Sequence, residues 1–244
     1  MMQIPTGALA IILSDSNAIL AACQQHDAAS ASQSEADAEL ALALQQLTDV
    51  MTRVESDMQS GGDSSSTDIT GIGDYALQLH ETLSAATSQR QLNDLQPRLA
   101  SLAINMALWI ARHGGRIETL EPVANALALV ANSSREPVEL GKLSGVMAEI
   151  IAAVSSVISQ DLEKMNPGRP WRVLLLNYSI VATRSHDTDL METAFATLSN
   201  LLPEEASRFF SEGMEQMDAL DYPPQVRRVM EKYHREWPVK RSLH

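Results

Sequence analysis

The sequence has almost no cysteine and no long apolar run, and each absence excludes a class of protein. The 244 residues include a single cysteine, so no disulfide framework can form within the chain and no zinc site can be built from several cysteines. No stretch approaches the roughly 18 uninterrupted apolar residues that a membrane span needs. The apolar fraction of 45% is nevertheless too high for an intrinsically disordered protein. We therefore expect a globular, cytoplasmic protein.

Positive charge is also scarce, and it is unevenly distributed. The formal net charge of -13 argues against general binding of nucleic acid or of an anionic membrane, because phosphates need neutralising Lys and Arg side chains. Residues 1–89 carry 12 acidic side chains and one basic side chain, Arg53. Residues 219–244 carry six basic and three acidic side chains. The C-terminal segment is therefore the one whose field could attract an acidic partner.

Motifs that carry catalysis or hold a cofactor are missing as well. The chain contains no Gly-rich phosphate loop followed by Lys, no Rossmann glycine pattern and no Gly-x-Ser-x-Gly nucleophile elbow. Glu231 and His234 have the spacing of a di-iron ligand pair, but no second such pair exists to complete the site. We therefore predict no catalytic residue, no cofactor and no metal, and we favour a noncatalytic role over an enzyme.

Helical periodicity is what the sequence has in abundance. Strand-like alternation is scarce, whereas Ala and Leu are frequent, and this predicts an all-α fold. One apolar stripe between residues 40 and 58 steps alternately by four and three residues, so it lies on one face of a helix. The stripe consists of Leu40, Leu44, Leu47, Met51, Val54 and Met58. We expect it to be buried against another helix, from the same chain or from a second copy.

A polar stretch rich in Ser and Gly follows this helix at residues 60–66. Such a composition is typical of a connection between helical segments. It predicts an acidic N-terminal helical segment, residues 1–60, and a main helical domain, residues 67–244. The alternative is that the two parts pack together as one domain.

Proline marks where later helices begin. Pro137 and Pro170 each precede an apolar stripe, which suits a first helical turn because the missing proline N–H has no partner there. The stripe from Leu143 to Val157 predicts one long helix that ends near Pro167. The loops between helices are mostly short, which predicts antiparallel neighbours.

Two stretches of the chain resemble each other and indicate an internal repeat. Residues 105–112 and 177–184 both read Asn, bulky, small, aliphatic, bulky, with Arg in the eighth place. Each is followed by a turn and by a helix with the pattern Leu-x-x-x-Ala-x-Ala. Two related hairpins would be the unit of an α-solenoid-like stack of antiparallel helical hairpins. A compact helical bundle is the alternative architecture.

The repeated Asn and Arg are the first candidate protein-binding residues. Asn105 and Arg112 lie two helical turns apart on one face, as do Asn177 and Arg184. One interpretation is structural: each buried Asn ties neighbouring helices together, and each Arg faces free carbonyl groups at a helix end. The alternative is that both faces line a groove, in which Asn pairs with a peptide backbone and Arg with a carboxylate.

The C-terminal segment holds the second set of candidates. An apolar stripe with helical spacing runs from Val226 to Trp237. Four basic residues lie off this stripe, and they are Arg227, Arg228, Lys232 and Arg235. One interpretation is a capping helix docked on the preceding hairpin. The other is a basic helix that binds a partner.

These patterns favour a noncatalytic function in protein–protein interaction, as an adaptor or scaffold. The identity of the protein partner is not encoded in any motif. One alternative is an enzyme or small-ligand binder with a pocket between helices. A second alternative is a self-associating structural protein, a homo-oligomer formed through residues 40–58.

Overall fold

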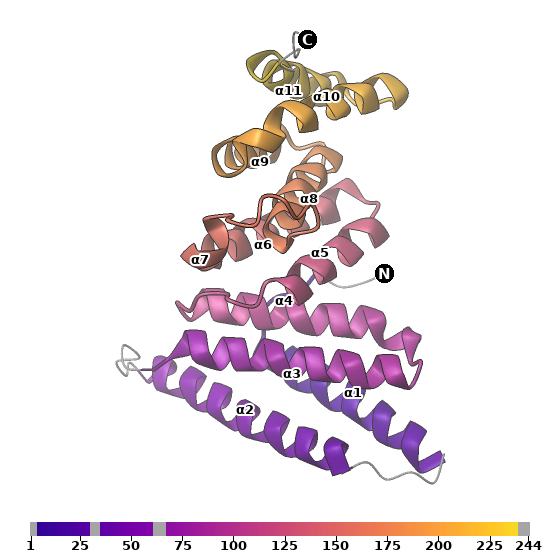
Figure 1. The fold of residues 1–244 in the computed structure, drawn as a ribbon, viewed down its shortest axis with the longest axis vertical. Coiled ribbons are helices and arrows are strands. Elements are labelled where there is room, and N and C mark those ends of the chain that lie inside the picture. The colour runs from indigo at the N-terminus through magenta and orange to yellow at the C-terminus, as the bar shows by residue number, and fades with distance from the viewer. Residues whose placement is uncertain (1–3, 30–34, 61–66, 239–244) are drawn as a thin grey trace.

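A computed structural model describes residues 4–29, 35–60 and 67–238, most of which form helices stacked along one long axis (Figure 1). Apart from one isolated bridge between Ile117 and Val154, these residues form no β-structure, so the all-α prediction is confirmed. None of their helices combines the length and the apolar character that crossing a membrane requires. The helices are α1 (Leu9–Ala29), α2 (Glu35–Gln59), α3 (Ile69–Gln89), η2 (Asn93–Leu95), α4 (Gln96–Arg112), α5 (Glu121–Ser133), α6 (Pro137–Ala153), α7 (Ser156–Ser159), α8 (Pro170–Arg184), α9 (Thr188–Leu201), α10 (Pro203–Ala219) and α11 (Pro224–Glu236).

Proline and capping residues set where many of these helices begin. Helices α4, α5, α6, α8, α10 and α11 carry proline in the first turn, where its missing N–H leaves no hydrogen bond unmade. Asp68 caps α3 by accepting a hydrogen bond from the N–H of Gly71. Asp187 caps α9 by accepting from the N–H groups of Asp189 and Leu190. The prediction that α6 and α8 begin at proline is confirmed.

The prediction of one long helix ending near Pro167 is wrong, because α6 ends at Ala153. Val154 is extended (φ −60°, ψ 139°) and lies in the parallel bridge with Ile117. The N–H of Ile117 donates to the Ala153 carbonyl at 2.9 Å, and the N–H of Ser155 donates to the Ile117 carbonyl at 3.0 Å. A contact with a loop far away in sequence therefore ends the helix where the local pattern would continue it.

Helices α1 to α4 pack together at the N-terminal end of the stack. Helix α1 contacts α2, α3 and α4, and α3 contacts α2 and α4. Arg90, just beyond α3, donates to Asp27 of α1 and to Asp37 of α2, each at 2.8 Å. The hydrogen bond from Arg90 favours the charged carboxylate and lowers the pKa of Asp27 to about 2. The acidic N-terminal segment is thus bound to α3 by an ion network.

The apolar stripe of α2 faces this group of helices. Leu44, Leu47 and Met51 are at most 4% exposed, and α2 contacts α1 and α3 of the same chain. The predicted burial is confirmed, and the partner helices belong to the same chain. Only Met58, at the end of the stripe, is substantially exposed. Self-association through the buried residues of this stripe would therefore require this packing to open.

Helices α5 to α11 continue the stack (Figure 1). Helix α4 contacts α5 and α6, α8 contacts α5, α6 and α9, and α9 contacts α10 and α11. One hydrophobic core extends through these layers from Leu9 in α1 to Tyr233 in α11, so the helices on both sides of residues 61–66 share it. The α-solenoid interpretation stays a prediction, since α1 packs against α4 out of chain order.

Candidate protein-binding sites

Asn105 is fully buried in α4 and holds a segment of its own chain. Its Oδ1 accepts hydrogen bonds from the backbone N–H groups of Thr6 at 3.1 Å and Gly7 at 2.8 Å. Its Nδ2 donates to the carbonyl of Ser101 at 2.8 Å. Both polar atoms of the side chain therefore have partners, as burial requires. Asn105 fixes the segment that precedes α1 against α4.

Arg112 completes this contact two turns later. Its Nε and Nη2 donate to the carboxylate of Glu149 in α6 at 2.6 and 2.9 Å, and its Nη1 donates to the Thr6 carbonyl. The hydrogen bond with Glu149 raises the pKa of the Arg112 guanidinium. The contacts expected of a groove, Asn with a peptide backbone and Arg with a carboxylate, are thus made within the chain. We call Asn105, Arg112 and the bound Thr6 and Gly7 the N-terminal clamp.

Gly7 allows the N-terminal segment to approach α4 this closely. Its φ of +70° lies in the left-handed region that favours glycine. A Cβ atom at this position would lie 2.8 Å from the Cβ of Leu108 and 3.1 Å from Nη1 of Arg112. Any larger residue would therefore push the segment away from the clamp.

The second copy of the pattern has other partners. Arg184 donates from Nη1 to the Ala131 carbonyl at 2.8 Å and from Nη2 to the Ser134 carbonyl at 2.6 Å, at the C-terminal end of α5. This is the structural role expected of an Arg that faces free carbonyls. Asn177 is half-buried, and its side chain makes no hydrogen bond with any residue that the structure describes. The two Asn and Arg pairs therefore do not share a common set of contacts.

The helices that follow the two copies also differ in register. Leu120 precedes α5, whereas the matched Leu190 lies inside α9. Ala126 is buried, whereas the matched Ala196 is exposed. The two similar sequence stretches therefore belong to helical hairpins whose second helices pack differently.

The basic C-terminal helix packs as α11 on α9 and α10 with most of its apolar stripe buried. Arg227 donates to Asp218 at 2.6 Å and to Glu231 at 2.9 Å. Lys232 donates to both carboxylate oxygens of Glu192, at 2.9 and 2.8 Å, and this contact lowers the pKa of Glu192. The packing and these ion pairs give α11 the geometry of a capping helix.

Arg228 and Arg235 are the two basic residues of α11 that stay available. Both are exposed, and neither forms an ion pair within the described ranges. Arg235 donates from Nε to the carbonyl of Glu231 at 3.3 Å. The positive field of this helix is thus partly compensated by its own acidic neighbours.

A groove beside α7 brings together residues that no sequence motif marks. The bridge between Ile117 and Val154 lays the loop before α5 along the segment that follows α6. With α3 and the start of α8, these segments line a cavity of about 480 Å³, which we call the α7 groove. Its lining includes Glu81, Glu118, Glu121, Val157, Leu162 and Trp171.

A buried ion pair folds the loop on one side of the α7 groove. Arg169, only 4% exposed, donates from Nε and Nη2 to Asp161 at 2.5 and 2.8 Å. It also donates from Nη1 to the carbonyls of Lys164 and Asn166 at 3.3 and 3.1 Å. The hydrogen bond with Asp161 raises the pKa of the Arg169 guanidinium. The loop between these two residues is therefore closed around one cation.

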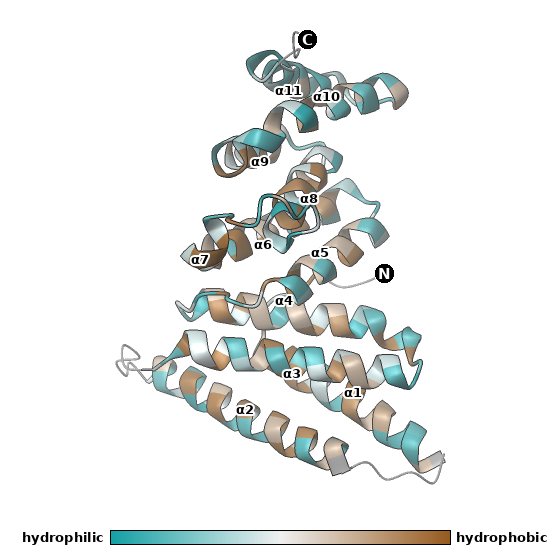
Figure 2. Ribbon diagram, viewed as in Figure 1, coloured by the Kyte–Doolittle hydropathy of each residue, from teal (hydrophilic) through white to brown (hydrophobic). Residues whose placement is uncertain are grey.

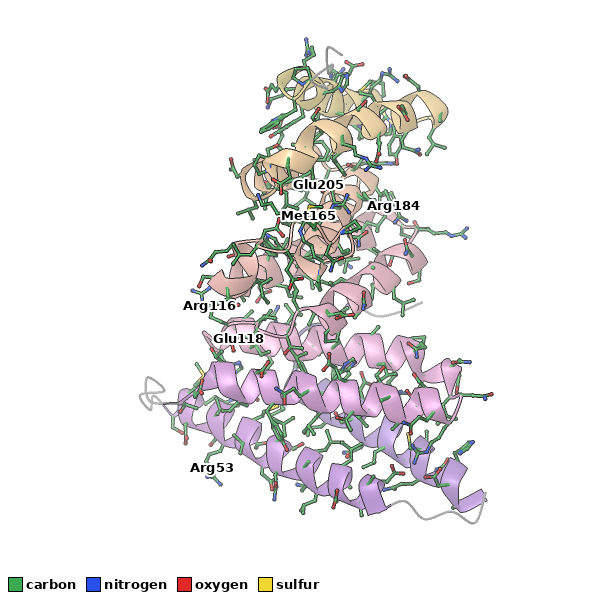
Figure 3. The ribbon with its side chains drawn as sticks, viewed as in Figure 1. Arg53, Arg116, Glu118, Met165, Arg184 and Glu205 are labelled. Carbon is green, nitrogen blue, oxygen red and sulfur yellow. The ribbon has the colours of Figure 1, made fainter. Side chains whose placement is uncertain are left out.

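This loop and α7 expose large apolar side chains. Val157 is 72% exposed, Leu162 79% and Met165 96%. Figure 2 shows the apolar character of α7, and Figure 3 shows Met165 on the loop that crosses in front of α8. Single exposed apolar residues are ordinary, whereas a group of them is typical of an interaction site.

Carboxylates without partners line the α7 groove together with Val157 and Leu162. Glu81, Glu118, Glu121 and Glu163 line the α7 groove and are exposed, and their side chains form no ion pair or hydrogen bond within the described part of the chain. The buried Trp171 lines the same groove, and its indole Nε1 has no hydrogen-bond partner there. The groove thus combines negative charge and apolar surface.

A second cavity, of about 620 Å³, adjoins the α7 groove and shares Glu81 and Glu121 with it. His80 lines this cavity, and its Nε2 lies 3.0 Å from the Leu99 carbonyl, which assigns the proton to Nε2. Its Nδ1 is buried without a partner, and burial lowers the pKa of the imidazole. Among the described residues, no hydrogen bond joins His80 to a nucleophilic or acidic side chain, and no group of His, Cys, Asp or Glu could hold a metal ion.

The apolar spacing of α6 explains why sequence reasoning missed the α7 groove. Val157 continues the stripe of α6, so the pattern places it on a buried helix face. Leu162 and Met165 fall off this stripe and lie among polar residues just before Pro167. Apolar residues outside any periodic pattern are the signal that could have indicated an exposed loop.

No protein-family model, no curated protein and no solved structure matches this chain. The candidate sites therefore depend on their geometry alone.

Proposed function

We propose that this chain is a noncatalytic adaptor of the cytoplasm that binds another protein through the α7 groove. The observation that carries the proposal is the exposure of Val157, Leu162 and Met165 on a segment fixed by the buried pair of Asp161 and Arg169. Keeping apolar area in water costs about 25 cal/mol per Å² relative to burying it. A fixed loop that nevertheless presents such area supports a role in binding.

The other candidate surfaces support this choice by contrast. In the N-terminal clamp, Asn105 and Arg112 already use their polar groups on the chain itself. In α11, Arg227 and Lys232 are engaged by acidic neighbours. The α7 groove combines apolar side chains and carboxylates that lack partners within the described residues.

Site-specific photo-crosslinking in the cell that produces the protein tests this function. A photoreactive residue replaces Met165 in one variant and Leu42 of α2, which is also exposed at 60%, in the control. We expect one protein to crosslink to position 165 and not to position 42. With that protein purified, Met165→Ser combined with Leu162→Ser should weaken binding about tenfold, whereas Leu42→Ser should not. A crosslinking pattern that is the same at both positions, or unchanged affinity in the double variant, would contradict the proposal.

A further inference from the structure

We infer that the partner segment that docks in the α7 groove carries an apolar side chain flanked by Lys or Arg. This inference rests on the proposed function and adds the chemistry of the partner. It is carried by the charge of the groove, where four exposed carboxylates remain unpaired around an apolar surface. These carboxylates are Glu81, Glu118, Glu121 and Glu163.

Carboxylates elsewhere on the stack are often compensated by cations. Glu149 pairs with Arg112, Glu192 with Lys232, and Glu205 of α10 with Arg172 at 2.5 Å. Each of these ion pairs joins two helices, so cations compensate carboxylates at several contacts between helices. The four exposed carboxylates of the α7 groove have no such cation within the described residues, and they line one cavity together with apolar side chains.

The two cations of the loop beside the α7 groove are paired with acidic side chains. Arg169 is buried against Asp161, and Lys164 lies 3.5 Å from Glu204. The negative potential of the groove is therefore not cancelled from its own loop. A cationic partner would be attracted to it, whereas an acidic partner would be repelled.

The apolar part of the groove defines the rest of the partner. Val157 and Leu162 are exposed, and the buried Trp171 lines the same cavity. An apolar side chain of the partner would bury this surface. Because Glu81 and Glu121 also line the adjoining cavity, the acidic rim continues beyond the apolar contact. Cationic side chains that flank the apolar anchor would meet this rim.

Two synthetic peptides serve as probes of this chemistry. One is an amphipathic helical peptide made only of Leu and Lys, and the other has Glu in place of every Lys. Fluorescence anisotropy measures the binding of each labelled peptide to the full chain at a salt concentration of about 0.15 M, where exposed charges are screened over about 8 Å. We expect the Leu/Lys peptide to bind and the Leu/Glu peptide not to bind.

A matched pair of variants separates site binding from attraction to the net charge. The site variant is Glu81→Lys with Glu118→Lys. The control is Glu39→Lys with Glu215→Lys, which changes the net charge equally at exposed positions outside the α7 groove. We expect the site variant to weaken Leu/Lys binding about tenfold or more and the control to weaken it less than about twofold. Circular dichroism checks that both variants stay helical.

The apolar contribution has its own matched pair. Leu162→Ser with Met165→Ser should weaken Leu/Lys binding, whereas Leu42→Ser with Leu220→Ser, at other exposed apolar positions, should leave it unchanged. Equal weakening by the two charge variants, or no binding of the Leu/Lys peptide to the wild-type chain, would overturn the inference. If crosslinking at Met165 still identifies a partner in that case, the proposed function stands and only the cationic chemistry fails. If the peptide binds as expected and no partner crosslinks, the chemistry stands and the adaptor function fails.

Discussion

The two stretches that share the Asn-to-Arg pattern, residues 105–112 and 177–184, make different contacts in the fold. In the first, Asn105 and Arg112 bind a backbone segment of the same chain, and Arg112 also binds Glu149. In the second, Arg184 binds the carbonyl groups at the end of α5, and Asn177 makes no side-chain hydrogen bond within the described residues. The difference lies in what approaches each helix, since both stretches are helical and end in the same residue type.

This contrast shows that a repeated pattern predicts a helix and the face on which its Asn and Arg lie. It does not predict which groups bind these side chains. The segment at residues 4–8 lies against α4, and α1 continues from it toward the N-terminal end of the stack (Figure 1). No such segment is bound by Asn177 within the described residues.

The largest difference is expected between Asn105→Ala and Asn177→Ala. Removing Asn105 leaves the N–H groups of Thr6 and Gly7 without their acceptor, and each unsatisfied group costs about 1–3 kcal/mol when it stays buried. We expect Asn105→Ala to lower the free energy of unfolding by about 2–4 kcal/mol. Asn177→Ala should lower it by less than about 0.5 kcal/mol.

Urea unfolding followed by circular dichroism measures both values in parallel. Equal losses in the two variants would show that the two stretches are equivalent after all. A small loss for Asn105→Ala would show that the N-terminal segment is held by other contacts.

The close approach of this segment to α4 gives the next largest effect. Gly7→Ala combines left-handed backbone strain with a Cβ contact of 2.8 Å to Leu108. Gly114, after α4, has a φ of +80°, but a Cβ atom there would meet no described atom within 4 Å, so Gly114→Ala isolates the backbone strain alone. We expect Gly7→Ala to be more destabilising than Gly114→Ala by about 1–3 kcal/mol, measured as a difference in unfolding free energy. Equal destabilisation would contradict the tight packing of Gly7.

Local spacing was enough to predict most of the helices but not the places where distant segments meet. The stripe of α2 and the prolines of α6 and α8 lie where their patterns place them, because an apolar face and a first-turn proline act within one helix. The end of α6 depends on a bridge to Ile117, which its own residues do not specify. The same bridge holds together two segments that line the α7 groove. The groove and the end of α6 both depend on this contact between distant segments, so local spacing could predict neither of them.

For the candidate residues, too, local spacing predicted the position of the side chain but not its binding partner. Asn105 was expected to be hydrogen-bonded because it is polar within an apolar helix. That its acceptor atom serves Thr6 and Gly7 depends on how the chain returns past α4. Arg227 and Lys232 likewise lie off the apolar stripe as expected, whereas their pairing with Asp218 and Glu192 depends on the packing of α11.

A smaller effect should distinguish the two arginines. Arg112 and Glu149 are 44% and 36% exposed, so their coupling should be at most about 1 kcal/mol and should weaken with salt. A double-mutant cycle of Arg112→Ala and Glu149→Ala measures this coupling from unfolding free energies. The matched cycle of Arg184→Ala and Glu149→Ala should give no coupling, because Arg184 binds carbonyl groups instead. Coupling in the second cycle would show that the arginines share a partner.

The smallest effect at neutral pH concerns His80, which joins α3 to α4 through the Leu99 carbonyl. Burial lowers the pKa of His80, so the unfolded chain takes up its proton first as the pH falls. Stability from the neutral imidazole is therefore present above the unfolded pKa of about 6.5 and is lost below it, by at most about 1.4 kcal/mol per pH unit. Neither Asn105 nor Asn177 titrates, so variants at these positions should keep this pH dependence.

His80→Gln tests this assignment, because an amide can still donate to the Leu99 carbonyl but cannot take up a proton in this range. We expect the wild-type urea midpoint to fall between pH 6.5 and 5 and the His80→Gln midpoint to fall less, since Asp27, with a pKa of about 2, stays charged there. The two chains should differ little at pH 7.5, where His80 is neutral in both the folded and the unfolded state. Parallel pH profiles for the two chains would show that another group causes the acid sensitivity. A profile that flattens only in His80→Gln would place the cause at the contact between α3 and α4, on the same helix that binds the N-terminal segment.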